Sequence, residues 1–322
     1  MQEEGARVPQ NAPLRVVILG AGAIGQSFAA VFEDAGAAVT LAEPDTARRE
    51  AVPQGLAVQR DAIALARLTR NGGGNVTIVP SANAEVGAAD LVIECGPENV
   101  EAKRAIFAGL LALAGPETVL ATASSAIAIS RIVEDEAQQR RCLVAHPINP
   151  PAVLRMVELV PAPGTLPGTM ARAEALFGAA GFAAVKLGRE IEGFVLNRLQ
   201  GAILREAYRL VDEGVTDVAG IEAGVRLGLG PRWALSGPFE TAELNTPGGI
   251  VAHAARMGPA YRRMGEARGE TVDWRPDLVA RVAAERRLAL PEDRIPARVG
   301  WRARAVARLV AARDRLLGDA DE

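Results

Sequence analysis

The sequence predicts an α/β protein: an N-terminal doubly wound sheet of the Rossmann type, residues 1–190, followed by an all-helical C-terminal domain, residues 191–322. Two observations predict the sheet. An apolar run leads into a glycine-rich turn and a helical pattern, and strand-like and helix-like segments then alternate as they do in parallel sheets. A third observation predicts the change of domain, because beyond residue 190 apolar residues recur at helical spacing and no convincing strand follows. Residues 1–13 are polar and are expected to form a loose tail.

The elements of the sheet domain follow from apolar runs and their boundaries. Residues 14–19 form the first expected strand, and residues 26–35 form a helix that ends at Gly36, a residue type favoured after helix ends. Further strands are expected at 39–42, 76–79, 91–94, 119–121 and 142–145, and helices at 57–68, 99–114 and 127–137. A last apolar run, residues 156–160, is interrupted by Glu158.

The helical domain is predicted from one long apolar face that begins at residue 191. Its members are Ile191, Phe194, Val195, Leu199, Ala202, Ile203, Leu210 and Val211. Further helical stretches follow, and the segment after about Glu292 is typical of an amphipathic helix.

The composition excludes several classes of protein. With 49% hydrophobic and 23% charged residues among 322, the chain is typical of a soluble globular protein. A formal net charge of −3, with no lysine- or arginine-rich tract, argues against nucleic acid or an anionic membrane as a partner. No apolar stretch has the length of a membrane span. Cys95 and Cys142 lack metal-ligand spacing, so we expect no metal site and two free thiols in a cytoplasmic protein.

A glycine motif follows the first expected strand and opens the first helix, at Gly20, Gly22 and Gly25. In a dinucleotide-binding turn the first glycine permits the tight turn, and the second lets the pyrophosphate approach the backbone. The third lets helix and strand pack closely. The amides of Ala23 and Ile24 would face the phosphates at the positive end of the helix. The motif therefore predicts a dinucleotide cofactor.

Glu43 indicates which dinucleotide is preferred. It ends the second expected strand, eighteen residues after Gly25. An acidic side chain at that place accepts hydrogen bonds from the adenosine ribose hydroxyls of NAD. Arg48 and Arg49 lie nearby and keep NADP open as an alternative, but the predicted cofactor is NAD.

A second candidate segment leaves the strand at 91–94 and enters a helix, at the sheet edge where ligands bind in open α/β folds. Glu98 lies in the first turn of that helix and could bond the ribose on the nicotinamide side. Lys103 is one of only two lysines, whereas arginine supplies the other cationic side chains. Because the two residue types are not interchangeable at a tight site, we predict a function for Lys103, with a solvated helix lysine as the alternative.

The predicted catalytic pair is His146 and Glu158. His146 follows the strand at 142–145, at the same sheet edge, and Glu158 stands in an apolar run where a carboxylate is rare without a partner. A histidine held by a carboxylate serves as a tuned general base, because the carboxylate selects the tautomer and stabilises the imidazolium. A histidine paired for structural reasons is the alternative. His253, the other histidine, is expected to be structural or exposed.

Two polar residues are predicted to contact the substrate. The strand at 119–121 ends in Thr122-Ala123-Ser124-Ser125, whose hydroxyls could donate to a substrate oxygen or cap the following helix. Asn197 is polar within a strongly apolar helical segment and should therefore meet a partner, either the substrate carbonyl or His146. A structural hydrogen bond of Asn197 is the alternative.

With these motifs assembled, the chain resembles the 3-hydroxyacyl-CoA dehydrogenase family over roughly residues 14–245. The segments that carry the resemblance are GAGAIG with Glu43, DLVIECGPENVEAK, the serine-rich turn leading to AHPINPP and VELV, and GFVLNRL. The resemblance implies that the family's base, orienting glutamate, substrate serine and substrate asparagine are His146, Glu158, Ser125 and Asn197. It also implies that Glu98, Lys103 and Asn149 contact the cofactor, and that the protein is a homodimer joined through the helical domain.

Departures from the acyl-CoA pattern point to a smaller substrate. The helix that carries a lysine cluster in the acyl-CoA branch reads RDAIALAR at 60–67, although its arginines could still meet a phosphate. The segment 230–241, GPRWALSGPFET, is similar to the L-gulonate 3-dehydrogenase (lambda-crystallin) branch. The carnitine dehydrogenase branch also has an arginine followed by tryptophan or tyrosine at this place. A planar guanidinium binds a carboxylate with two parallel hydrogen bonds. We therefore predict Arg232 as the carboxylate anchor, with a surface arginine stacked on Trp233 as the alternative.

The predicted function is NAD-dependent oxidation of the 3-hydroxyl of a small, L-gulonate-like hydroxy acid to the 3-keto acid, an oxidoreductase reaction of the EC 1.1.1 type. Oxidation of an L-3-hydroxyacyl-CoA or of carnitine is the alternative within the same class. A non-catalytic, NAD-binding structural protein is the alternative from another class, and the intact candidate pair argues against it.

Overall fold

The computed structural model describes residues 13–269, 276–298, 301, 312 and 315. By its internal contacts the chain divides into two compact units, Met1–Ile203 and Leu204–Glu322. This division falls within helix α7 (Leu196–Asp212), whereas the sequence predicted a boundary at residue 190. Residues 1–12 of the expected tail and most of the helix expected after Glu292 lie outside the described residues.

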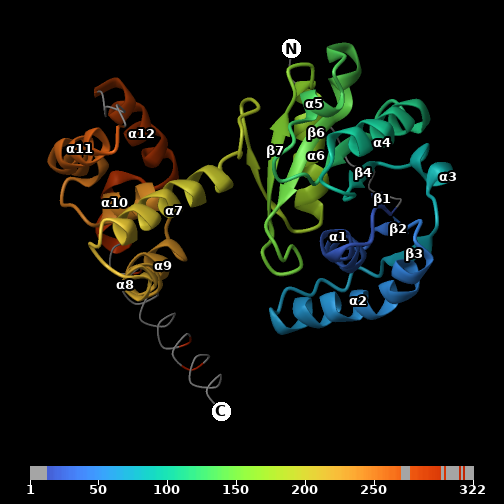
Figure 1. Cartoon of the computed structure of the whole chain (residues 1–322), viewed down its shortest axis with the longest axis horizontal. Helices are drawn as coiled ribbons and strands as arrows, with labels where there is room; N and C mark the ends of the chain where they lie inside the picture. The colour runs from blue at the N-terminus through green and yellow to red at the C-terminus, as the bar shows by residue number, and fades with distance from the viewer. Residues whose placement is uncertain (1–12, 270–275, 299–300, 302–311, 313–314, 316–322) are drawn as a thin grey trace. The chain divides into compact units, whose positions relative to one another are not determined.

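The first unit is built on one mixed sheet of eight strands, in the order β3-β2-β1-β4-β5-β6-β7-β8 (Figure 1). The strands are β1 (Arg15–Leu19), β2 (Ala38–Ala42), β3 (Asn75–Val79), β4 (Leu91–Glu94), β5 (Val119–Thr122), β6 (Cys142–Pro147), β7 (Met156–Pro161) and β8 (Ala183–Lys186). Strands β1 to β6 are parallel, and the reversal of strand order beside β1 produces the doubly wound topology.

At one edge the doubly wound sheet departs from parallel pairing. Strand β7 runs antiparallel to β6, and β8 is parallel to β7. Only eight residues, 148–155, separate β6 from β7, which is too short for the crossover that a parallel neighbour requires. As a result, His146 and Glu158 are directly opposite each other in the register of the two strands.

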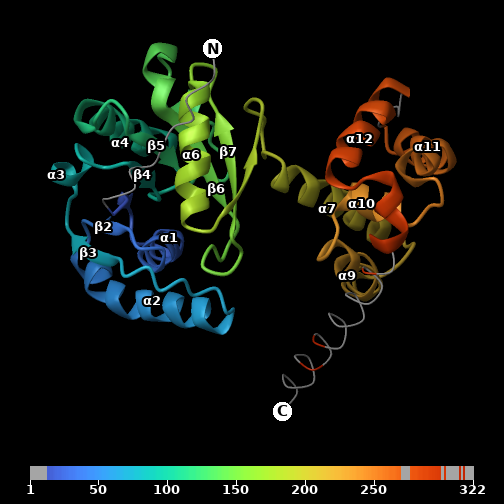
Figure 2. The same cartoon turned by 180° about the vertical axis from the view of Figure 1, so that it is seen from behind.

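Helices cover both faces of the sheet (Figures 1 and 2). Helices α1 (Ala23–Asp34), α2 (Thr46–Leu65) and α6 (Pro167–Ala179) contribute to one buried cluster, which includes the mutually packed rings of Phe28, Phe32, Phe177 and Phe182. Helices α3 (Asn83–Val86), α4 (Val100–Leu113) and α5 (Ile129–Ile132) contribute to the cluster on the other face. A doubly wound sheet is therefore buried on both sides, as its apolar strands require.

Two predicted helices differ from the structure. Helix α2 begins at Thr46 rather than at residue 57, because Asp45 caps it by accepting a hydrogen bond from the amide of Arg48 at 2.8 Å. The helix expected at 127–137 is instead the short α5 and a 3₁₀ turn, Glu136–Arg141. Isoleucine and valine are frequent between 127 and 133, and such β-branched side chains weaken helix propensity.

The described part of the second unit is helical, as predicted. After α7 come α8 (Val218–Ala223), a π-helical turn (Gly224–Leu229), α9 (Gly230–Trp233), α10 (Pro238–Leu244), α11 (Gly249–Ala267), α12 (Pro276–Ala289) and a 3₁₀ turn (Glu292–Arg294). Arg268 joins the end of α11 to α7 through an ion pair with Glu206 at 3.0 Å. In the described residues we find no helix with the length and apolar character needed to span a bilayer.

Candidate active site

The carboxyl ends of the parallel strands bring the predicted motifs to one edge of the sheet. Leu19 of β1 pairs in register with Glu94 of β4, and Glu94 pairs with Thr122 of β5. The glycine loop, the 94–103 segment and the serine turn therefore leave the sheet side by side. His146 leaves the same edge near the end of the next strand, β6. This edge is the place where an open α/β sheet binds its ligands.

The glycine loop has the shape that a dinucleotide requires. Gly20 has a φ of +103°, and a Cβ there would lie 2.7 Å from the carbonyl oxygen of Cys95. A Cβ on Gly25 would lie 2.0 Å from the carbonyl oxygen of Gly20. A Cβ on Gly22, in contrast, would meet no atom within 4 Å. Gly22 is also the N-cap of α1 and offers no side-chain oxygen, so the helix end is open to a phosphate at the predicted position.

Glu43 lies at the end of β2 and is tied to this loop. One carboxylate oxygen accepts a hydrogen bond from the amide of Ala21 at 3.1 Å, and the other accepts one from the amide of Asp45 at 3.1 Å. Each oxygen keeps a lone pair for a ribose hydroxyl. Arg49 donates to the carbonyl oxygens of Glu43 and Pro44 at 2.8 and 3.1 Å, so its guanidinium is already held by the backbone. The residues present thus fit NAD.

Gly22 and Gly25 should respond differently to alanine. We expect Gly25→Ala to lower the melting temperature, because its methyl group would overlap the backbone of Gly20. Gly22→Ala should leave the melting temperature near that of the wild type but weaken NAD binding at least about tenfold, since the methyl group occupies the space of the pyrophosphate. Thermal denaturation and calorimetric titration with NAD measure both effects. A Gly22→Ala protein with wild-type affinity for NAD would contradict the assignment.

Lys103 is placed at this edge, but it is buried rather than presented to solvent. Its ammonium lies 2.8 and 3.0 Å from the two carboxylate oxygens of Glu94 and 3.6 Å from Glu98. Glu94 is fully buried and also accepts hydrogen bonds from the Thr122 hydroxyl and the Gly96 amide, both at 2.7 Å. Sequence reasoning missed Glu94. Its signal was a carboxylate at the end of an apolar strand, nine residues before a rare lysine.

Glu98 joins this buried cluster to the serine turn. Its carboxylate accepts hydrogen bonds from the Ser124 hydroxyl and, at 3.2 Å, from the amide of Ser125. Ser124 is the capping residue, because its hydroxyl accepts from the amide of Ile127 at 2.8 Å. Ser125 is exposed, and within the described residues its hydroxyl forms no hydrogen bond. Of the two serines, Ser125 is therefore the one whose hydroxyl can meet a substrate.

His146 and Glu158 form a buried pair. The distance between His146 Nδ1 and a carboxylate oxygen of Glu158 is 2.7 Å, and their exposed fractions are 5% and 0%. The other carboxylate oxygen accepts from the amides of Val195 and Leu196 at 2.8 and 3.0 Å. Burial raises the pKa of the Glu158 carboxyl, but the bonds from His146 and the two amides outweigh it and hold the pKa below its ordinary value. The ionised Glu158 selects the Nδ1–H tautomer, which leaves Nε2 as the proton acceptor.

Two further predicted residues also lie in the first unit. Asn197, in the first turn of α7, donates from Nδ2 to the backbone carbonyl of Ser125 at 3.1 Å. This is the structural hydrogen bond that the sequence left open as the alternative, and contact of Asn197 with the substrate stays a prediction. Asn149 is exposed in the turn that follows β6.

Arg232 lies in the second unit, where it lines a pocket of about 470 Å³. The other lining side chains include Trp233, Phe239, His253 and Tyr261. Arg232 Nε donates to the carbonyl of Gly228 at 3.1 Å, and among the described residues its terminal nitrogens form no hydrogen bond, so they can meet a ligand. His253, predicted to be structural or exposed, is partly buried, and its Nδ1 is 3.1 Å from the hydroxyl of Thr246. Burial and the nearby Arg256 lower the pKa of His253.

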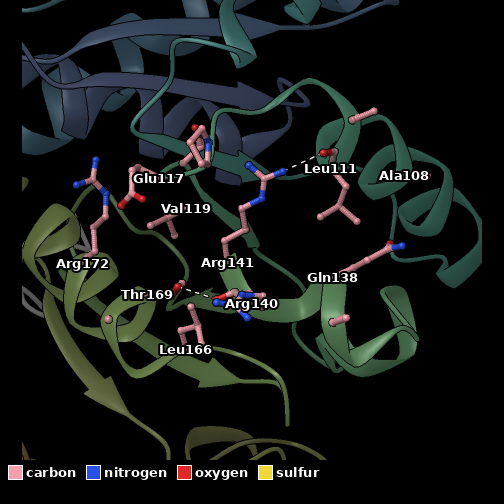
Figure 3. A pocket seen from close by; sticks show the side chains of 15 residues that line it. Ala108, Leu111, Glu117, Val119, Gln138, Arg140, Arg141, Leu166, Thr169 and Arg172 are labelled. Atoms are coloured by element: carbon pink, nitrogen blue, oxygen red, sulfur yellow. Dashed lines mark hydrogen bonds between the residues drawn. The ribbon is translucent and has the colours of Figure 1, made fainter.

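A pocket of about 940 Å³ lies at the opposite edge of the sheet, beside the first residue of β5 (Figure 3). Arg140, Arg141 and Arg172 are among its lining residues. Arg141 donates to the carbonyl of Leu111 at 2.9 Å, and Arg172 donates to Asp90 at 3.2 Å. Two of the three arginines therefore serve the fold, and the pocket is separate from the candidate site.

Comparisons with known proteins show the family of the chain. The model of the 3-hydroxyacyl-CoA dehydrogenase NAD-binding domain matches residues 15–191, and the model of the C-terminal domain of the same enzymes matches residues 193–290. The lambda-crystallin homolog of Bos taurus is 34% identical over 317 residues, which cover 95% of this chain and 98% of that protein. The L-carnitine dehydrogenase of Streptomyces griseus is 32% identical and covers 76% of this chain and 74% of its own. The crystal structure of FadB2 from M. tuberculosis, 29% identical, superposes with a TM-score of 0.62 over 85% of this chain and 95% of its own.

Proposed function

The chain belongs to the 3-hydroxyacyl-CoA dehydrogenase family, and from this premise we propose that it oxidises the 3-hydroxyl of a small hydroxy acid, such as L-gulonate, to the corresponding 3-keto acid with NAD. The observation that carries the proposal is the buried His146–Glu158 pair at the carboxyl edge of an NAD-binding sheet. Such a pair provides the general base that the oxidation of an alcohol needs.

The proposed mechanism assigns one task to each residue. NAD, held at the glycine loop and by Glu43, would supply the acceptor for the hydride on the carbon that carries the hydroxyl. Nε2 of His146 takes the hydroxyl proton, and Glu158, which remains ionised, stabilises the imidazolium that forms. Ser125 Oγ donates a hydrogen bond to the reacting oxygen, and Asn197 orients the substrate while it holds the Ser125 backbone. Glu98, Lys103 and Asn149 are proposed for the nicotinamide side of the cofactor site.

The proposed substrate is a free acid because of Arg232. Its guanidinium lines a pocket with aromatic walls, and a guanidinium binds a carboxylate through paired hydrogen bonds. The relatives include L-carnitine dehydrogenases, whose named substrate is also a hydroxy acid, so carnitine is the second candidate. Its quaternary ammonium would find aromatic faces in Trp233, Phe239 and Tyr261.

The test is the formation of NADH, followed by its absorbance at alkaline pH, with L-gulonate, 3-hydroxybutyrate, L-carnitine and 3-hydroxybutyryl-CoA. We expect turnover of a free acid and little turnover of the thioester. Preference for the thioester would overturn the substrate proposal, and inactivity toward the whole panel would favour a non-catalytic NAD-binding protein. The homodimer implied by the resemblance stays a prediction that light scattering can check.

Removing the guanidinium of Arg232 should weaken the binding of the substrate. We expect Arg232→Ala to raise the KM for the preferred hydroxy acid at least about tenfold, because a charge-assisted bond to the carboxylate is lost. The control is Arg263→Ala, an exposed arginine of α11 in the same unit, which should leave KM unchanged. Steady-state kinetics with saturating NAD measure both. An unchanged KM in Arg232→Ala would show that another residue holds the carboxylate.

A further inference from the structure

The short segment that precedes α7 has an unusual backbone. Gly193 has a φ of +75° and Phe194 a φ of +49°, two consecutive residues in the left-handed region. A bulky residue such as phenylalanine rarely adopts this conformation, because its Cβ crowds the neighbouring carbonyl. Strained backbone of this kind persists only where the surrounding structure holds it, and it gathers at functional sites.

The strained residue is held beside the catalytic pair. Phe194 is 1% exposed, and its ring centroid lies 5.6 Å from that of the His146 imidazole. Its own amide donates to the carbonyl of Ile191 at 3.1 Å, which closes the turn. The turn therefore fixes the direction in which the chain enters α7.

The backbone N–H groups of the two residues that follow this turn point toward Glu158. Val195 and Leu196 donate to a single carboxylate oxygen at 2.8 and 3.0 Å, while the other oxygen holds His146. The carbonyl of Val195 accepts the first bond of the helix, from Leu199 at 3.0 Å, so Leu196 occupies the first helical position. Glu158 is thus the anion at the N-terminus of α7, where backbone amides and the helix dipole favour a negative charge.

We propose that the left-handed turn at Gly193 and Phe194 is a positioning device for the base. It directs the amides of Val195 and Leu196 onto Glu158, and this keeps Glu158 ionised and oriented so that it holds His146 with Nε2 available for a proton. Among the described residues, the charged side chain in contact with His146 is Glu158 on β7. The turn contributes an apolar ring and two uncharged amides, and the nearby Ser125 and Asn197 are also uncharged. The inference rests on the proposed role of His146 as the base.

A single backbone substitution tests the device. Leu196→Pro removes one of the two N–H donors, and proline is favoured at the first helical position, so the helix itself should tolerate it. The matched control is Leu196→Ala, which loses the same side chain but keeps the N–H group. Losing the N–H bond raises the pKa of the Glu158 carboxyl, so the pair retains its proton to a higher pH.

Two measurements separate this inference from the proposed function. The chain has only two histidines, so nitrogen NMR of histidine-labelled protein resolves the His146 ring once His253→Gln identifies the other signal. We expect Leu196→Pro to lower the population of the Nδ1–H tautomer and to move the acid limb of kcat/KM upward by about one pH unit. Leu196→Ala should match the wild type in both. Inactivity of the wild type would refute the proposed function, while the NMR comparison would still decide the inference.

The inference would be contradicted if Leu196→Pro and Leu196→Ala had the same NMR spectrum of His146 and the same pH profile of kcat/KM. If Leu196→Pro does not fold, Gly193→Ala serves as the second variant. A Cβ at Gly193 would lie 3.4 Å from the nearest side-chain atom of Arg198, so the substitution has room and strains only the φ of +75°. It should change the NMR signal of His146 in the same direction, and an unchanged signal would overturn the inference.

Discussion

Replacing His146 by glutamine should lower kcat for the preferred hydroxy acid by about 10³-fold, while the affinity for NAD stays near that of the wild type. Glutamine keeps a donor for Glu158 but cannot accept the substrate proton. The glycine loop and Glu43, the proposed dinucleotide site, form no hydrogen bond with His146 among the described residues. Initial rates at saturating NAD measure the loss of turnover, and calorimetric titration with NAD checks that the cofactor site is intact.

His253→Gln is the matched control, since it makes the same chemical change in the second unit. His253 lines the pocket assigned to the substrate, so we expect its replacement to act on KM. At saturating substrate kcat should remain within about threefold of the wild type, because His253 bonds the hydroxyl of Thr246 and has no carboxylate partner among the described residues. A His146→Gln enzyme that kept a tenth of the wild-type rate would remove His146 from its role as the base.

Replacing Lys103 by methionine should destabilise the protein by about 3–5 kcal/mol, which for many domains is a large part of the free energy of unfolding. The side chains of Lys103 and Glu94 are 1% and 0% exposed, and the substitution would leave Glu94 charged and buried without its counter-ion. Urea denaturation, monitored by circular dichroism, measures the loss of stability. The curves are fitted with a separate transition for each of the two units.

Two control proteins identify the cause. In Lys103→Met/Glu94→Gln no buried charge remains unpaired, and much of the lost stability should return. Lys186→Met breaks a surface pair with Glu174, in which the two side chains are 51% and 43% exposed, and should change stability by less than about 1 kcal/mol. If Lys103→Met were as stable as Lys186→Met, the buried pair would have no part in holding this edge of the sheet.

Much of the fold could be predicted because its central strands are short apolar runs that end in turns. In a chain where such runs alternate with helical segments, this pattern indicates buried parallel strands. The segment between residues 162 and 190 could not. Strand β8 is an exposed edge strand of four residues, two of them alanine, so it carries neither a continuous apolar run nor a clear alternation. Helix α6 begins without a capping side chain and contains two glycines, which weakens its helical signal.

In the candidate site, the features that depend on side-chain type could be predicted from the sequence, whereas those that depend on the backbone could not. His146 and Glu158 could be paired from the sequence, because a rare histidine and a carboxylate in an apolar run each require a partner. The antiparallel pairing of β6 and β7, which makes these two residues direct neighbours, could not be predicted, because the alternation of strands and helices indicates parallel pairing. The amides of Val195 and Leu196 have no sequence signature at all, because every residue except proline carries one.

The burial of Lys103 also has a practical consequence for work with the protein in solution. Lysine occurs at only two positions, and the side chain of Lys103 is 1% exposed and held by two carboxylates. Lys186 is half exposed at the end of β8. Amine-directed reagents should therefore modify a single lysine side chain, so that a fluorophore or a surface tether can be attached through Lys186 without mutagenesis and away from the carboxylates that bind Lys103.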